Sequence, residues 1–123
     1  MNELKWLRTL LIGTVLIVMP LTANALRLAD GNDWSKSTDS ERRAYLVGIS
    51  NMISVGNAYD TKKVPGEDRT FMRKSYRGLS HTTIPEAMQR VNEWYRENPG
   101  RMDVPVLSVL WMDIVKPRLA ENQ

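Results

Sequence analysis

Two segments of the chain begin with the same helix-start pattern, and this pattern limits the possible folds more than any other feature. Thr38 is followed by Glu41, and Thr83 by Glu86, each as Thr-x-x-Glu ahead of a stretch rich in apolar residues. In such a capping box the Thr oxygen accepts a hydrogen bond from the backbone N–H three residues later, and the Glu carboxylate accepts one from the N–H of the Thr. Both segments are therefore predicted to form helices that begin at these threonines.

The residues after Thr38 follow helical spacing. Apolar and small residues recur three and four positions apart, which predicts one buried helix face. The residues of that face are Tyr45, Gly48, Ile49, Met52, Val55, Gly56 and Tyr59. Gly48 and Gly56 each disfavour a helix by roughly 1 kcal/mol relative to alanine, so we expect them at a close contact between helices rather than at a hinge.

Two more helices are predicted from the positions of acidic residues and prolines. One opens at Glu67 and Asp68, whose negative charge is favourable at the positive end of the helix dipole. The other opens at Asp103 with Pro105 and ends at Pro117, which lacks the N–H that a helix interior needs. The predicted apolar side of the first is Phe71, Met72, Tyr76 and Leu79. The predicted core face of the second is Leu107, Leu110, Trp111 and Ile114.

The helix that starts after Thr83 keeps its apolar spacing as far as Tyr95 and stops at the Asn-Pro-Gly sequence of residues 98–100. No stretch alternates apolar and polar residues as a half-buried strand does. We therefore expect an all-α fold, a small single-domain bundle of about four helices. The expected core aromatic residues are Tyr45, Phe71, Trp94 and Trp111.

Residues 26–36 precede the first predicted helix and show no periodicity. They contain the turn-rich sequence Asp-Gly-Asn-Asp at 30–33, and we expect an irregular lead-in that docks Trp34. The order of carboxylates and the sixth-position Gly of a calcium-binding EF-hand loop are missing. No metal site is predicted here.

The N-terminal residues follow the three-part pattern of a secretory signal peptide. Lys5 and Arg8 precede an uncharged apolar run at residues 10–19, and Pro20 then breaks the run. The sequence Ala-Asn-Ala at residues 23–25 supplies the small-x-small site that signal peptidase accepts. This pattern predicts export with cleavage after Ala25.

We therefore predict a signal peptide at residues 1–25 and a single helical domain at 26–123, located in the periplasm. The alternative is an uncleaved membrane anchor, because the uncharged stretch at residues 9–26 reaches the lower end of the roughly 17 to 25 residues that cross a bilayer. The chain has no Cys, so neither lipid attachment nor a disulfide is expected. Packing alone must then stabilise the domain.

The composition argues against catalysis. One His and no Cys remove most sets of zinc, copper and haem ligands and every thiol nucleophile. His81 and Glu86 are the one candidate acid–base pair, and no nucleophile accompanies them. We therefore predict a protein that is not an enzyme and that holds no cofactor or metal.

Residues 60–80 carry an unusual concentration of positive charge. Arg69, Arg73 and Arg77 recur four residues apart, so a helix would place them on one face. The six cations of the segment are Lys62, Lys63, Arg69, Arg73, Lys74 and Arg77. Two interpretations remain open: a solvated helix face, or a docking surface for an acidic partner or for anionic lipid headgroups. Nucleic acid is not an expected partner of an exported protein.

Two segments resemble the Rap/Tai family of small periplasmic helical proteins. They are residues 41–49, Glu-Arg-Arg-Ala-Tyr-Leu-Val-Gly-Ile, and residues 83–91, Thr-Ile-Pro-Glu-Ala-Met-Gln-Arg-Val. The second continues through Trp94, Tyr95, Asn98, Pro99, Arg101 and Pro105. In the family pattern a first helix carries an aromatic residue and a Gly, matched by Tyr45 and Gly48. A Thr-capped helix then ends in a Tyr followed by Asn-Pro, matched by Tyr95 and residues 98–99.

The resemblance implies an immunity protein that blocks peptidoglycan amidase effectors of type VI secretion systems. The chain departs from the family pattern in lacking cysteines and in carrying the basic segment at residues 60–80 in place of a short loop. We therefore expect a periplasmic helical domain that binds another protein, either a cell-wall amidase or a component of an envelope complex. The alternative is a non-catalytic accessory subunit of an envelope complex, with membrane contact only if the N-terminal segment is retained.

Overall fold

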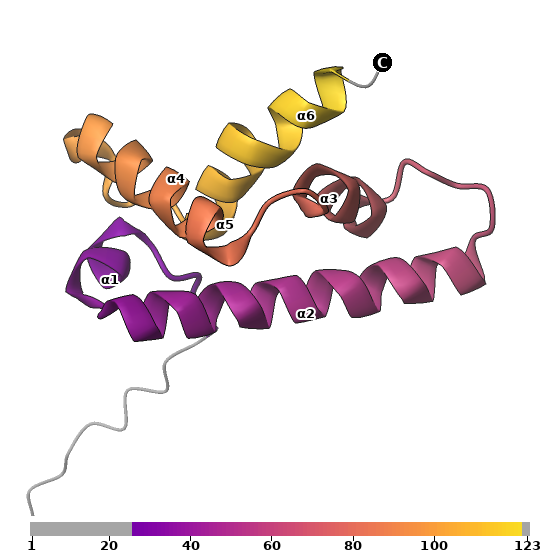
Figure 1. Cartoon of the computed structure of the whole chain (residues 1–123), viewed down its shortest axis with the longest axis horizontal. Helices are drawn as coiled ribbons and strands as arrows, with labels where there is room; N and C mark the ends of the chain where they lie inside the picture. The colour runs from indigo at the N-terminus through magenta and orange to yellow at the C-terminus, as the bar shows by residue number, and fades with distance from the viewer. Residues whose placement is uncertain (1–25, 122–123) are drawn as a thin grey trace, which may run out of the picture.

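The computed structural model describes residues 26–121, and over this range the fold is all-α, as predicted. The predicted signal peptide at residues 1–25 lies outside the described residues. The elements are α1 (Gly31–Lys36), α2 (Asp39–Lys63), α3 (Phe71–Leu79), α4 (Ile84–Glu97), the 3-10 turn η2 (Pro99–Arg101), α5 (Val106–Leu110), the π-helical turn η3 (Trp111–Val115) and α6 (Lys116–Glu121). The long helix α2 runs along one side of the molecule, and the other helices gather on a single side of it (Figure 1).

Both predicted capping boxes are confirmed. At the start of α2 the Thr38 hydroxyl accepts from the Glu41 N–H at 3.3 Å, and Glu41 Oε2 accepts from the Thr38 N–H at 2.7 Å. At the start of α4 the corresponding distances between Thr83 and Glu86 are 3.3 and 2.8 Å. These backbone contacts lower the pKa values of both carboxyl groups, so each Glu stays charged while it caps its helix.

The lead-in is not irregular, which corrects the sequence prediction. It forms the short helix α1, whose N-cap Asp30 makes a third capping box with Asp33. Trp34 docks as predicted, because its side chain is 5% exposed and its Nε1 donates to Asn92 Oδ1 at 2.7 Å. The Arg42 guanidinium of α2 lies over the Trp34 ring, 5.4 Å from its centroid. Through Arg42 and Asn92, Trp34 of α1 therefore contacts both α2 and α4.

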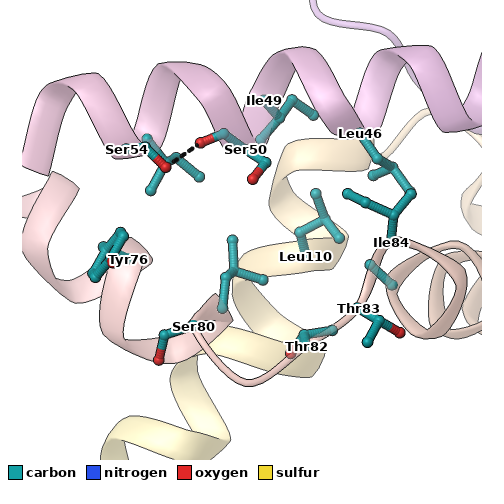
Figure 2. A pocket seen from close by; sticks show the side chains of 13 residues that line it. Leu46, Ile49, Ser50, Ser54, Tyr76, Ser80, Thr82, Thr83, Ile84 and Leu110 are labelled. Atoms are coloured by element: carbon teal, nitrogen blue, oxygen red, sulfur yellow. Dashed lines mark hydrogen bonds between the residues drawn. The ribbon is translucent and has the colours of Figure 1, made fainter.

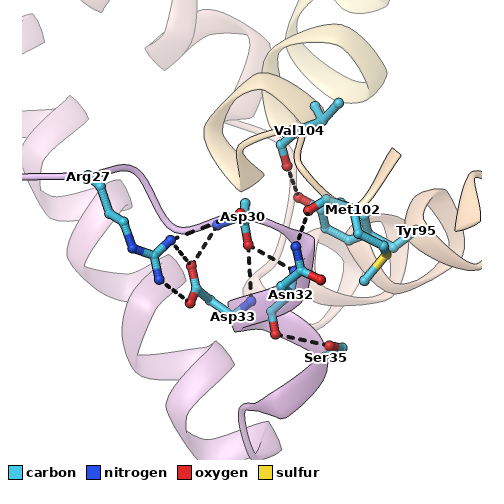
Figure 3. A network of polar contacts seen from close by, with 8 residues as sticks. All are labelled: Arg27, Asp30, Asn32, Asp33, Ser35, Tyr95, Met102 and Val104. Carbon is cyan, nitrogen blue, oxygen red and sulfur yellow. Dashed lines mark hydrogen bonds and ion pairs between the residues drawn. The ribbon is translucent and has the colours of Figure 1, made fainter. Parts of the chain in front are cut away.

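The lead-in also pairs with the segment before α5. The Gly31 N–H donates to the Met102 carbonyl at 2.8 Å. The Tyr95 hydroxyl donates to the nearby Val104 carbonyl at 2.6 Å (Figure 3). A Cβ at Gly31 would lie 2.5 Å from Cε1 of Tyr95, so the glycine allows this approach. Burial raises the pKa of Tyr95 to about 12, which keeps its hydroxyl protonated as a donor.

Aliphatic side chains dominate the core, whereas the sequence predicted four aromatic ones. Tyr45 and Trp94 are only partly buried against the core, Trp111 is partly buried, and Phe71 is 62% exposed. The buried cluster consists of Trp34, Leu46, Ala87, Val91, Tyr95, Val106, Val109, Leu110 and Ile114. Valines of α4 and α5 fill the centre, and the four aromatic rings that the sequence predicted to be there lie at the edges.

The inward face of α2 differs from the predicted one in its second half. Met52, Val55 and Tyr59 were predicted to be buried, but they are 63%, 66% and 61% exposed. Gly48 lies in open space, so its predicted helix contact is wrong. The predicted contact at Gly56 is confirmed, since a Cβ there would lie 2.6 Å from Cγ of Met72 on α3.

The last helix continues through Pro117, which the sequence predicted to end it. The π-helical turn η3 precedes the proline, and there the Lys116 N–H donates to the Trp111 carbonyl, five residues back. Leu110 and Ile114 are buried as predicted, whereas Leu107 is 37% exposed because α5 turns Val106 and Val109 inward instead. Of the helices within residues 26–121, none combines the length and apolar character that crossing a membrane requires.

Candidate protein-binding surface

A hollow between α2, α3 and the last helix is lined almost entirely by apolar side chains, and we call it the apolar groove. Its volume is about 180 Å³. The lining residues are Ile49, Met52, Ile53, Phe71, Met72, Ser75, Leu79, Leu107, Leu110, Trp111 and Val115. Met52, Phe71 and Leu107 are exposed residues among them, so the groove opens to solvent.

Small residues on α2 and α3 produce this arrangement. α3 approaches α2 where Gly56 meets the Met72 side chain, and it approaches the last helix where a Cβ at Gly78 would lie 2.7 Å from Cα of Val115. Ser75, between these two contacts, is 2% exposed. The backbones therefore come close at small residues, and the larger apolar side chains beside them line the groove instead of filling one core.

Two aromatic residues form one wall of the groove. The Phe71 and Trp111 rings stack with centroids 4.9 Å apart and an interplanar angle of 25°. Phe71 lies at the start of α3 and Trp111 lies in the π-helical turn. The stack holds two helices together at the protein surface and presents a flat apolar face to an incoming group.

An exposed apolar flank of α2 extends the groove toward the loop between α2 and α3. Met52, Val55, Tyr59 and Lys63 are three or four residues apart, so they lie on the same side of the helix. The first three are more than half exposed. This flank therefore leads from apolar side chains to a positive charge at the C-terminal end of α2.

The structure separates the six predicted cations into groups. Lys62 and Lys63 are exposed in the last turn of α2, and Arg69 is exposed in the loop that follows. We call these three residues the basic end of the surface. Arg69 lies two residues before Phe71, the groove-lining residue at which α3 begins. Its Nε lies 3.3 Å from Glu67 Oε1.

Arg73 does not lie on a solvated face, which corrects the prediction of a continuous arginine stack. Its side chain is only 8% exposed, and its Nη1 donates to the Glu67 carbonyl and to Asp68 Oδ1, the latter at 3.2 Å. These contacts hold residues 67–68 in the loop, so the helix does not begin there as predicted. It begins after Thr70, whose hydroxyl caps it by accepting from the Arg73 N–H at 3.3 Å. We therefore assign Arg73 a structural role in the loop between α2 and α3.

Lys74 and Arg77 lie away from the groove. Arg77 is exposed in the last turn of α3, two residues from the groove-lining Ser75. Residues two apart in a helix point to nearly opposite sides. Arg77 therefore points away from the groove, and Lys74 is half-buried.

A second hollow, between α2, the end of α3 and the start of α4, is lined by hydroxyl groups as well as by apolar side chains, and we call it the hydroxyl-lined pocket (Figure 2). Its volume is about 230 Å³, and it shares Ile49, Ile53, Leu79 and Leu110 with the apolar groove. Its hydroxyl-bearing residues are Ser50, Ser54, Tyr76, Ser80, Thr82 and Thr83. Three of these hydroxyls form local hydrogen bonds: Ser54 donates to the Ser50 carbonyl at 2.9 Å, Ser80 donates to the Arg77 carbonyl at 3.0 Å, and Thr83 donates to Glu86 Oε2 at 3.0 Å. Buried Thr82 Oγ1 has no hydrogen-bond partner.

Neither hollow brings together groups that transfer protons. Their linings contain no carboxylate, imidazole, amine or guanidinium. His81 is exposed in the turn before α4, and Glu86 is committed to its capping box with Thr83. Across residues 26–121 no three His, Cys, Asp or Glu side chains gather closely enough to hold a metal ion.

Comparison of the chain with family models, with curated proteins and with solved structures finds no match. The resemblance to the Rap/Tai family therefore stays a prediction from the residues that carry it. The groove was not predicted from sequence, because Met52, Phe71 and Leu107 were assigned to buried faces. The one sequence signal for it is that α2 carries more large apolar residues than a single helix face can hold.

Proposed function

We propose that the chain is an exported, non-catalytic helical domain that binds another protein through the apolar groove and its basic end. One observation carries this proposal: Met52, Tyr59 and Phe71 are each more than 60% exposed, on or beside the groove. Soluble domains rarely leave large apolar side chains exposed together unless the patch is an interaction site.

The chemistry of the two hollows supports binding rather than turnover. Their linings offer apolar contacts, hydroxyl groups and one phenol, Tyr76. A catalytic site needs at least a nucleophile or a proton-transfer group held near a position for the substrate. An interface needs shape, apolar contact and a charged rim, and the groove with its basic end offers these.

The N-terminal pattern at residues 1–25 supports a periplasmic location. The resemblance to the Rap/Tai family makes a peptidoglycan amidase the first partner to test. An accessory role in an envelope complex is the alternative, and it differs because the partner would not be inhibited.

The test is to isolate the tagged chain from the envelope of cells that produce it, after cross-linking, and to identify any protein bound in stoichiometric amount. We expect such a protein, and we expect Met52→Gln to release it while Val47→Gln does not, since Val47 is exposed on α2 but lines neither hollow. Loss of peptidoglycan cleavage when the chain is added to the captured protein would identify an inhibitor of an amidase. Recovery of no bound protein, or equal recovery with both variants, would contradict the proposal.

A further inference from the structure

We infer that the partner inserts an amphipathic helix into the apolar groove and that acidic residues at one end of this helix meet Lys62, Lys63 and Arg69. The inference rests on the proposed protein-binding function and specifies the chemistry of the partner. It is carried by the shape of the groove, by its lining and by the charge at one end of it.

The size and walls of the groove suit side chains of a helix. At about 180 Å³ the hollow is smaller than the roughly 300 to 1,000 Å³ of small-molecule sites, so it accepts a few apolar side chains rather than a whole ligand. Three helices line it, and Met52 and Met72 supply flexible thioethers that adapt to an incoming apolar face. Residues 26–121 contain no sheet edge to which an extended strand could add, and apolar walls formed by helices match the mode in which an amphipathic helix lies in a groove.

The net positive charge of residues 60–80 favours an acidic partner. Residues 60–80 hold six cations and three carboxylates, an excess of three that equals the net charge of +3 of the whole chain. Two of the carboxylates, Glu67 and Asp68, already face Arg69 and Arg73 at 3.3 and 3.2 Å. Lys62 and Lys63 are exposed at the end of the apolar flank, and carboxylates of a partner complement them.

A protein helix fits these observations better than an anionic membrane does. Basic and apolar side chains together also bind acidic lipid surfaces. A bilayer, however, contacts protruding side chains, whereas Ile49, Ile53 and Leu110 lie inside a hollow. A ridge of side chains on a partner helix reaches these residues and a flat lipid surface does not.

The experiment titrates the full chain, purified from the envelope of producing cells, with three probes. The first is a panel of amphipathic helical peptides with Leu, Ile or Met on one face and Glu at one end. The second is the same panel with Lys in place of Glu, and the third is vesicles of phosphatidylglycerol and phosphatidylcholine in equal parts. Affinity is measured by calorimetry, and occupancy of the groove by the indole N–H resonance of Trp111.

We expect a member of the Glu panel to bind and to shift the Trp111 resonance. Met52→Gln should weaken this binding about tenfold, the loss of one buried methionine contact, while the matched Val47→Gln leaves it unchanged. The double variant Lys62→Glu and Lys63→Glu should weaken it about threefold to tenfold at low salt and much less at high salt. The control is the double variant Arg43→Glu and Arg96→Glu, which changes the net charge by the same amount at exposed residues away from the groove. It should weaken peptide binding far less.

Three results would overturn the inference. They are no binding by any Glu peptide, binding of the Lys panel as tight as that of the Glu panel, or a shift of the Trp111 resonance by the vesicles and by neither peptide panel. If a partner protein is recovered from cells and Met52→Gln does not change its binding, the inference about the groove is wrong but the proposed protein-binding function is not contradicted. Recovery of no partner together with vesicle binding would overturn both and favour a lipid surface.

Discussion

Arg90 on α4 donates from Nη2 to the backbone carbonyl of Asp113 at 2.9 Å, and its Nε lies 3.2 Å from the Asp113 carboxylate. In an α-helix the Asp113 carbonyl would accept from the N–H of residue 117, which is a proline and has none. A side chain from a different helix therefore supplies the donor that the proline removes. The last helix continues through Pro117 with this contact beside it and with the π-helical turn directly before it.

We expect Arg90 and Pro117 to be energetically coupled. Arg90→Ala should lower the free energy of unfolding by about 0.5–1 kcal/mol, because the contact is half-exposed. In a Pro117→Ala background residue 117 can donate to the Asp113 carbonyl itself, so the same substitution should have a smaller effect. Urea unfolding of the four proteins of this double-mutant cycle measures the coupling. An equal effect of Arg90→Ala in both backgrounds would show that Arg90 does not replace the missing donor.

Two glycine substitutions should change stability in opposite directions. Gly78→Ala places a Cβ 2.7 Å from the Cα of Val115, a backbone atom that cannot move freely, and should destabilise the fold by about 1–3 kcal/mol. Gly48→Ala adds a Cβ in open space within α2 and should stabilise it by about 0.5–1 kcal/mol. Thermal and urea unfolding of both variants provide the measurement. A destabilised Gly48→Ala protein would mean that α2 has a contact at this position after all.

Tyr95→Phe should lower the free energy of unfolding by about 1–2 kcal/mol. The substitution keeps the buried ring but removes the hydroxyl that donates to the Val104 carbonyl at 2.6 Å, which leaves that acceptor without this donor. Urea unfolding gives the magnitude. Tyr59→Phe is the matched control, because the Tyr59 side chain is 61% exposed, and it should be neutral. Equal effects of the two changes would be incompatible with a structural role for the Tyr95 hydroxyl.

Acidification should destabilise the lead-in through Asp33. The hydrogen bond from Arg27, together with that from the Asp30 N–H, lowers the pKa of Asp33 from 3.8 to about 2 (Figure 3). Because the folded pKa lies below the unfolded one, the charged carboxylate stabilises the fold above pH 3.8, and this contribution is lost as the pH falls through about 2.

The check is urea unfolding of the wild type and Asp33→Asn between pH 7 and pH 2. The stability difference between them should be largest near neutral pH and should shrink toward pH 2. Asp103→Asn, which removes an exposed carboxylate, controls for the change in net charge. A difference that stays constant over this range would show that the Arg27–Asp33 contact does not form in solution.

The features that sequence predicted correctly are those decided by near neighbours in the chain. The caps at Thr38 and Thr83 each depend on a Glu three residues later, and the stop at residues 98–100 depends on the conformations that Pro and Gly allow. The concentration of six cations in residues 60–80 is read directly from the sequence, although which of them are exposed is not. These signals identified an all-α domain and the segment that carries its positive charge.

Tertiary contacts decided the rest, because they join residues that are far apart in sequence. α2 carries apolar residues on more than one side, so only the placement of α3 and α4 selects Leu46 and Gly56 as inward and leaves Met52 and Tyr59 exposed. Arg90 of α4 reaches the Asp113 carbonyl in the last helix, which continues through Pro117 although the sequence predicted it to end there. The groove follows from the relative rotation of three helices, a property that no single segment encodes.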